Sequence, residues 1–175
     1  YKSKTMRYLM IFLCILLGSC TGMPADIKAV QNFELQRYLG QWYEIARLDH
    51  SFERGLSHVS AHYTINNDGS VTVTNRGFKT DKNRWDEVQG RALMVEDPTV
   101  GHLKVSFFGP FFGSYVIFEL DQLHYQYAFV TSYNKEFLWL LARTPTVDEA
   151  VIQRFKAVIS TYDFDQQGLI WVDQS

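Results

Sequence analysis

The sequence predicts an all-β fold: an eight-stranded antiparallel up-and-down β-barrel with one C-terminal α-helix packed outside it and a short final strand. Three observations lead to this prediction. Eight short segments alternate apolar and polar residues, turn-forming residues separate them, and one segment near the C-terminus has helical spacing. A chain of 175 residues fits a single domain, and an eight-stranded barrel is wide enough to hold one small ligand.

The predicted elements follow one another in a simple order. Residues 32–40 predict a short helical turn that ends at Gly40, where a left-handed backbone costs least. The Asn67-Asp68-Gly69 turn joins the second and third strands as a hairpin. We expect strands over residues 41–49, 58–66, 70–78, 84–96, 103–108, 115–120, 124–132 and 136–143.

A helix is expected after the barrel strands. Thr146 is the predicted N-cap, and Asp148 and Glu149 follow it in the first turn, where acidic residues are favourable. The apolar positions form one stripe: Val147, Val151, Ile152, Phe155, Val158 and Ile159. We expect this stripe to cover the outside of the barrel, and residues 169–172 to form a last strand at the barrel edge.

The N-terminus has the pattern of a secretory leader. Lys2, Lys4 and Arg7 precede an apolar run over residues 8–17, which is too short to span a bilayer. The following Leu17-Gly18-Ser19-Cys20 resembles the lipobox of bacterial lipoproteins, in which the Cys is diacylated and becomes the mature N-terminus. The alternative is an ordinary cleaved signal in which Cys20 is incidental.

This pattern divides the chain into three parts. We expect a lipoprotein signal peptide over residues 1–19, with Met6 as the true start, then a lipidated tether over 20–31 and the barrel domain over 32–175. Residue 21 is Thr rather than Asp, which favours the outer membrane under the familiar sorting rule. The protein is thus expected to be lipid-anchored in the bacterial outer membrane, facing the periplasm.

Composition excludes several classes of function. Both cysteines, Cys14 and Cys20, lie in the leader or at its end, so the body contains no thiol for catalysis, metal binding or a disulfide. The net charge of −2 gives no reason to expect nucleic acid as a partner. His58 and His62 share one face of a strand, about 13 Å apart, so no metal site is expected there.

Four blocks of sequence carry a resemblance to the lipocalin family. Residues 33–47, with Gly40-Gln41-Trp42-Tyr43-Glu44 at their centre, resemble the opening of apolipoprotein D and, more closely, of bacterial outer-membrane lipocalins. Residues 52–56, 104–111 and 138–146 resemble the bacterial group. The middle motif departs from the family, because residues 120–125 replace the usual Thr-Asp-Tyr.

The resemblance implies roles for particular residues. Trp42 is expected to plug the closed end of the barrel, with Arg143 stacked over it, so that both are structural. Strand parity places Phe137, Trp139 and Leu141 inside the barrel, and Val88, Ala92 and Met94 are placed inside only by the apolar face that they share. The resemblance suggests further cavity residues: Val59, Ala61, Tyr63, Val73, Asn75, Phe107, Val116 and Phe118. Isolated polar groups such as Glu44 would interrupt this apolar lining.

These observations predict a membrane-anchored carrier or storage protein, not an enzyme, that binds amphipathic lipids without a cofactor or metal. Fatty acids, lysophospholipids or phospholipids are the expected ligands, with a role in envelope maintenance under stress. The alternatives are a fully packed barrel, an envelope interaction module, and a calycin-type lipid-modifying enzyme, although the lining offers few titratable groups. Phe111 and Phe112 would touch lipid, form a homodimer contact, or fold over the barrel.

Overall fold

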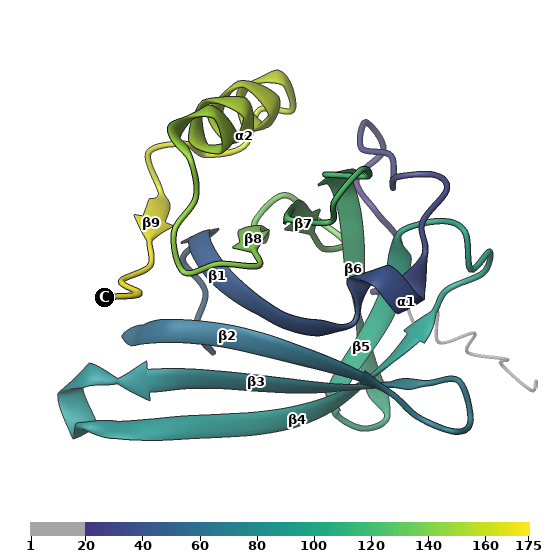
Figure 1. Ribbon diagram of the computed structural model, residues 1–175, viewed down its shortest axis with the longest axis horizontal. Helices are drawn as coiled ribbons and strands as arrows, with labels where there is room; N and C mark the ends of the chain where they lie inside the picture. Colours follow the sequence, from purple (N-terminus) through teal and green to yellow (C-terminus); the bar gives the residue numbers. More distant parts are fainter. Residues whose placement is uncertain (1–19) are drawn as a thin grey trace, which may run out of the picture.

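The computed structural model describes residues 20–175, so the predicted signal peptide and Cys14 lie outside the described residues. Eight antiparallel strands close into a barrel, as Figure 1 shows, and the predicted fold is confirmed. The strands are β1 (Gly40–Leu48), β2 (Leu56–Ile65), β3 (Val71–Lys79), β4 (Arg84–Met94), β5 (His102–Phe108), β6 (Phe111–Leu120), β7 (Tyr127–Thr131) and β8 (Leu138–Ala142). Each strand pairs with the next, and β1 pairs with both β2 and β8, which closes the sheet.

The two ends of the barrel differ. The short helix α1 (Leu35–Tyr38) lies at one end, next to the β2–β3 hairpin, where Gly69 has a φ of +83° and Asp68 caps the turn through Ser70. We call this the closed end. The opposite end carries the 3₁₀ turn η1 (Thr80–Lys82), the β1–β2 loop and the β5–β6 hairpin, and we call it the open end (Figure 1).

An outer layer covers one side of the barrel. Helix α2 (Glu149–Thr161) buries Phe155, Val158 and Ile159, and β9 (Leu169–Trp171) pairs with β1 on the outside (Figure 1). The predicted N-cap, Thr146, is wrong: the helix begins after Asp148, whose backbone is extended. Val147 packs on the outer core, so the chain enters the helix two residues later than the sequence suggests.

The N-terminal segment, residues 20–31, which the sequence predicts to be a lipidated tether, packs against the barrel. It runs along the outside of the barrel beside β6 (Figure 1), and Ile27 is 2% exposed. The Val30 amide donates to the Ile117 carbonyl at 2.8 Å, and the Gly101 amide donates to the Val30 carbonyl at 2.9 Å. A Cβ on Gly101 would lie 2.7 Å from Val30 Cγ2, so glycine makes this close contact possible. Most of the predicted tether therefore belongs to the folded body.

Strand β6 is buried on both faces. Tyr115 and Ile117 pack with the core inside the barrel, whereas Val116 and Phe118 pack with the outer core beneath α2. The Phe118 ring stacks on Phe164 with centroids 5.7 Å apart. The prediction that Val116 and Phe118 point inward is therefore wrong. A strand with apolar residues on both faces gives no alternation from which its direction can be read.

None of the helices within residues 20–175 has the length and hydrophobicity needed to cross a bilayer.

Candidate functional site: the barrel cavity

Trp42 and Arg143 seal the closed end. Trp42 is fully buried, and the guanidinium carbon of Arg143 lies 3.9 Å from the centre of its ring. Arg143 also donates hydrogen bonds to the carbonyls of Arg37, Leu39, Gln41 and Tyr125, over 2.7–3.1 Å. Gly40 has a φ of +93°, which turns the chain between α1 and β1 beside this guanidinium. The arrangement joins three chain segments across the barrel floor.

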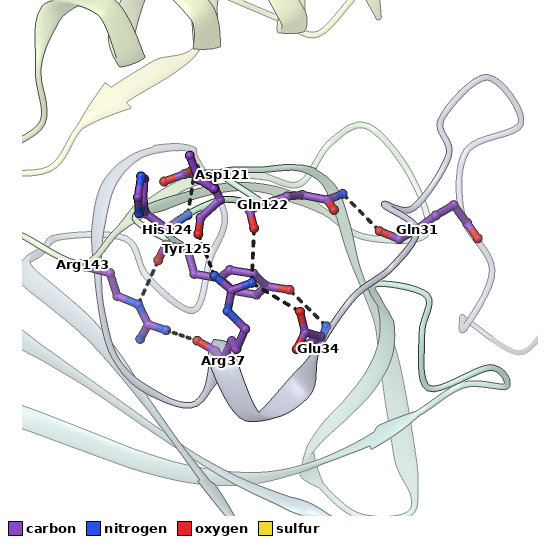
Figure 2. Close-up of polar contacts among 9 residues, drawn as sticks. Gln31, Glu34, Arg37, Asp121, Gln122, His124, Tyr125 and Arg143 are labelled. Atoms are coloured by element: carbon purple, nitrogen blue, oxygen red, sulfur yellow. Dashed lines mark hydrogen bonds and ion pairs between the residues drawn. The ribbon is translucent and has the colours of Figure 1, made fainter.

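The loop between β6 and β7, where the sequence departs from the family motif, holds α1 in place. Arg37 donates to the carbonyls of Gln122 and Leu123, and its guanidinium carbon lies 4.2 Å from the centre of the Tyr125 ring. Figure 2 shows Arg37 beside Tyr125 and Gln122. The Tyr125 hydroxyl accepts a hydrogen bond from the Glu34 amide at 3.1 Å. Asp121 shapes the loop by accepting from the backbone amides of His124 and Gln126. The altered motif thus still closes the barrel.

A cavity of about 810 Å³ occupies the rest of the barrel. This volume lies within the range of small-molecule binding sites, roughly 300–1,000 Å³. Of the residues predicted to face a ligand, nine border the cavity: Val59, Ala61, Tyr63, Val73, Asn75, Val88, Phe107, Trp139 and Leu141. Phe137 also borders it, and Gly90 makes room for Phe107, because a Cβ there would lie 2.7 Å from the Phe107 ring. A role of these residues in ligand binding stays a prediction.

Met94 packs in the inner core, but it does not border the cavity. It pairs with Leu103 near the closed end, below the floor of the cavity. Val116 and Phe118 lie outside the barrel, as described above.

Three tyrosines form a hydrogen-bonded cluster at the closed end of the cavity. The Tyr38 and Tyr115 hydroxyl oxygens are 2.7 Å apart, and the Tyr63 hydroxyl donates to Tyr115 at 2.9 Å. Burial raises the pKa of all three groups, so they remain neutral at physiological pH. Tyr63 and Tyr115 border the cavity and present hydroxyl groups to its deepest part.

A cluster of four ionisable side chains lies on one wall. Glu44 Oε1 is 2.9 Å from Arg47 Nη1, and Glu53 Oε2 is 2.6 Å from His50 Nε2. Trp139 donates its indole N–H to Glu53 at 3.1 Å. All four ionisable residues are less than 10% exposed, but only Glu44 and Glu53 border the cavity. The cavity wall therefore presents carboxyl oxygens, and Arg47 and His50 lie behind them.

The two carboxyl groups of this cluster differ in their affinity for protons. Burial raises the pKa of Glu44 well above its ordinary value of 4.5, and the nearby Glu53 adds to the shift, although Arg47 opposes it. Burial would also raise the pKa of Glu53, but its contact with His50 and the charge on that ring lower it. Glu44 therefore holds its proton to a higher pH than Glu53 does.

Sequence reasoning missed most of this cluster. A register shift in the β1–β8 pairing between Glu44 and Ala46 breaks the alternation of β1, so both Glu44 and Arg47 are buried. His50 and Glu53 lie in the loop after β1, where period-two parity gives no direction. Three charged residues and a histidine within ten positions were the available signal, but such a run is usually a solvated surface.

The fold and the site together define a cup-shaped barrel protein: a closed barrel sealed at one end around an internal cavity. The chain belongs to the lipocalin family, since the model of the lipocalin-like domain matches residues 33–174. It is 54% identical to the outer membrane lipoprotein Blc of Vibrio cholerae, over 97% of this chain and 99% of the relative. The Blc lipoprotein of Escherichia coli K12 is 44% identical over 93% of this chain and 91% of the relative.

More distant similarity extends to animal proteins. Rat apolipoprotein D is 27% identical over 91% of this chain and 84% of its own length. The structure of insecticyanin from the tobacco hornworm superposes with a TM-score of 0.70, covering 88% of this chain and 87% of that one, at 20% identity. That likeness supports the fold alone. The similarity to the bacterial relatives identifies the chain as a lipid-anchored protein of the outer membrane.

Proposed function

We propose that this protein binds amphipathic lipids in its barrel cavity and stores or carries them at the outer membrane. Fatty acids, lysophospholipids or phospholipids are the proposed cargo, and maintenance of envelope lipids under stress is the proposed purpose. Cys20 would carry the acyl chains that anchor the protein. The observation that carries the proposal is an internal cavity of about 810 Å³ with a mainly apolar and aromatic wall, open at one end.

The distribution of charge supports one orientation of the cargo. The wall near Glu44 and Glu53 presents carboxyl oxygens, which would repel the carboxylate or phosphate of a lipid head group. Basic side chains border the open end: Arg54 and Arg84, which pair with Asp49 and Asp86, and Lys79. Lys79 makes no ion pair with any residue between 20 and 175. The acyl chain is therefore expected inside and the anionic head group at the rim.

Native mass spectrometry of the lipoprotein purified from its membrane tests the proposal. We expect one copy of a fatty acid, lysophospholipid or phospholipid per chain, displaced by an added competitor. Trp139 or Tyr63 substitutions, or filling the cavity with Ala61→Trp, should abolish the bound mass. Trp171→Ala, a substitution of a half-exposed tryptophan outside the barrel, should leave it unchanged. A chain that stays empty and ignores added lipid would refute the carrier function.

A second candidate, a lipid-modifying enzyme, is favoured by one observation. The sequence suggests few titratable groups in the cavity, whereas the structure brings Glu44, Arg47, His50 and Glu53 together at its wall. The same spectra distinguish the two functions when a lysophospholipid is added. A carrier returns the lipid intact. An enzyme releases products of altered mass at a rate that Glu53→Gln abolishes.

A further inference from the structure

We propose that the open end of the barrel docks directly on the bilayer, with Phe52, Phe108 and Phe111 inserted among the lipids. These three residues are called the mouth aromatics below. The proposal extends the proposed function, because it takes Cys20 as the acylated anchor and names the surface from which cargo enters. It concerns a lipid surface and not a protein partner.

The first observation is the exposure of the mouth aromatics. Their exposed fractions are 65% for Phe52, 79% for Phe108 and 77% for Phe111, and all three border the cavity opening. Phe108 and Phe111 face each other across the β5–β6 hairpin, and Phe52 comes from the β1–β2 loop. Burying such side chains in an apolar environment is favourable because it removes apolar surface from water. Exposed apolar side chains gathered around an opening mark an interaction surface.

The neighbouring Phe112 contacts a side chain of the protein instead of bordering the cavity opening. It packs beneath Lys104, whose ammonium nitrogen lies 5.1 Å from the centre of the ring, on the outer face of the hairpin. Of the two phenylalanines that the sequence singles out in this loop, Phe111 is therefore the one that borders the cavity opening.

The second observation is the position of the lipid attachment site. The Cys20 carbonyl accepts a hydrogen bond from the Ser114 amide at 2.8 Å, and Asp26 pairs with Lys135 in the β7–β8 loop. Ser114 lies three residues after Phe111 in β6, roughly 10 Å along the strand. The buried side chain of Ile27 holds the segment against the barrel. Acyl chains on Cys20 would therefore emerge beside the open end, not the closed end.

The third observation is the charge around the opening. Arg54 pairs with Asp49, and Arg84 pairs with Asp86, so much of the charge at this end is compensated within the protein. Attraction to anionic lipids is therefore a minor contribution, and insertion of aromatic side chains is the main one. We expect docking to change little between low salt and 0.5 M salt, where surface charges are strongly screened.

A lipid surface fits these observations better than a second copy of the chain. A second copy bound to the mouth aromatics would cover the cavity opening. It would also place the acyl chains on both Cys20 residues at the interface between the copies. A bilayer buries the same side chains, accommodates the acyl chains of Cys20 and supplies cargo at the opening. Among the described residues, the closed end exposes two large apolar side chains: Leu123 at 74%, beside the charged groups of Figure 2, and Ile65 at 39%, at the end of β2.

Spin labels on the lipidated protein in phosphatidylethanolamine–phosphatidylglycerol vesicles test this orientation. With Cys20 acylated, Phe111→Cys provides a thiol at the open end, and Leu123→Cys provides a matched, equally exposed thiol at the closed end. We expect a label at position 111 to be accessible to oxygen and shielded from an aqueous nickel chelate, and a label at 123 to show the reverse. Equal accessibility at both positions would overturn the proposal. Shielding at 111 that depends on protein density would identify a second copy instead.

Lipid exchange provides an independent readout. Phe108→Ser/Phe111→Ser should slow transfer of a fluorescent lysophospholipid from vesicles at least tenfold, a larger factor than for uptake of the same lipid as a monomer from solution. Leu123→Ser is the control and should transfer at the normal rate. Normal transfer by the double variant would contradict the proposal. Membrane insertion at position 111 in a protein that binds no lipid would refute the carrier function and leave the docking intact.

Discussion

At the scale of single residues, Arg143 makes more contacts than its place in the sequence suggests. It stacks on Trp42 and also donates hydrogen bonds to four backbone carbonyls at the closed end. Because these contacts lie outside the cavity, we interpret the residue as structural. The sequence resemblance predicts the stacking, but only the structure shows that the guanidinium ties α1 to β1 and β8.

Arg143→Ala should lower the stability of the barrel. The loss of the stacking and of several hydrogen bonds should cost about 2–4 kcal/mol, equivalent to a Tm decrease of about 5–15 °C for a chain of this size. Thermal unfolding measures the effect. Arg91→Ala, which removes an exposed ion pair with Asp68, should change stability by less than about 1 kcal/mol. A large loss of lipid affinity at unchanged Tm would show that Arg143 acts on the ligand.

Glu44 should make stability depend on pH. Because burial raises its pKa in the folded state, the folded protein keeps a proton that the unfolded chain releases above about pH 4.5. Stability from this group is therefore greatest below that pH and falls as pH rises, by at most about 1.4 kcal/mol per pH unit. Glu44→Gln removes the ionisable group and therefore the decrease in stability that Glu44 causes as the pH rises.

Urea unfolding at pH 4.5 and pH 8 tests this prediction. The stability of Glu44→Gln relative to the native protein should increase between the two values. Glu87→Gln, at a neighbouring carboxylate on the cavity rim, should show no such trend. Parallel pH profiles for Glu44→Gln and the native chain would mean that Arg47 holds Glu44 charged.

At the scale of elements, the N-terminal segment shows most clearly what the sequence leaves open. The sequence suggests an extended tether here, whereas the structure contains an irregular segment with a turn at Ala25 and Asp26. Its hydrogen bonds and burial come from β6 and Gly101, which are about 70–90 positions away in the sequence. A local sequence pattern cannot predict contacts with residues that far away in the sequence.

Ile27→Ala should loosen this segment. Removing a buried side chain of this size costs about 2–4 kcal/mol. Because the segment lies at the chain terminus, we expect the loss to appear first as local opening. Hydrogen exchange at the Val30 amide, which bonds to Ile117, reports that opening. Lys28→Ala, at the exposed neighbouring position, serves as the control. Unchanged Val30 protection in Ile27→Ala would mean that the hydrogen bonds alone hold the segment.

At the scale of the whole molecule, the β-sheet of the barrel separates two hydrophobic cores, one inside and one outside it. The outer core holds α2, the N-terminal segment and the outward side chains of β6, and the inner core fills the barrel only near its closed end. The cavity beyond the Tyr38, Tyr63 and Tyr115 cluster lacks the van der Waals contacts that a filled core provides. A ligand that occupies it should therefore stabilise the whole barrel.

A bound lysophospholipid should raise the Tm. At a free concentration of one hundred times Kd, binding to the folded state alone adds about 2.7 kcal/mol, or about 5–10 °C. Differential scanning calorimetry with and without the lipid, below its micelle concentration, measures the shift. Ala61→Trp, which fills the cavity, should unfold cooperatively but show no shift. An equal shift in that variant would place the lipid outside the barrel.

The sequence by itself determined the barrel and the order of its strands, and its resemblance to the lipocalin family supplied the sealing pair Trp42 and Arg143 and most of the expected cavity-facing residues. Alternation and turn residues are local, so they can be read along the chain. Only the tertiary structure decided the direction of β6, the docking of residues 20–31 and the charged cluster around Glu44 and Glu53. Each of these depends on a partner distant in sequence: an outer layer that makes both faces of β6 apolar, a groove at Gly101, and a register shift against β8.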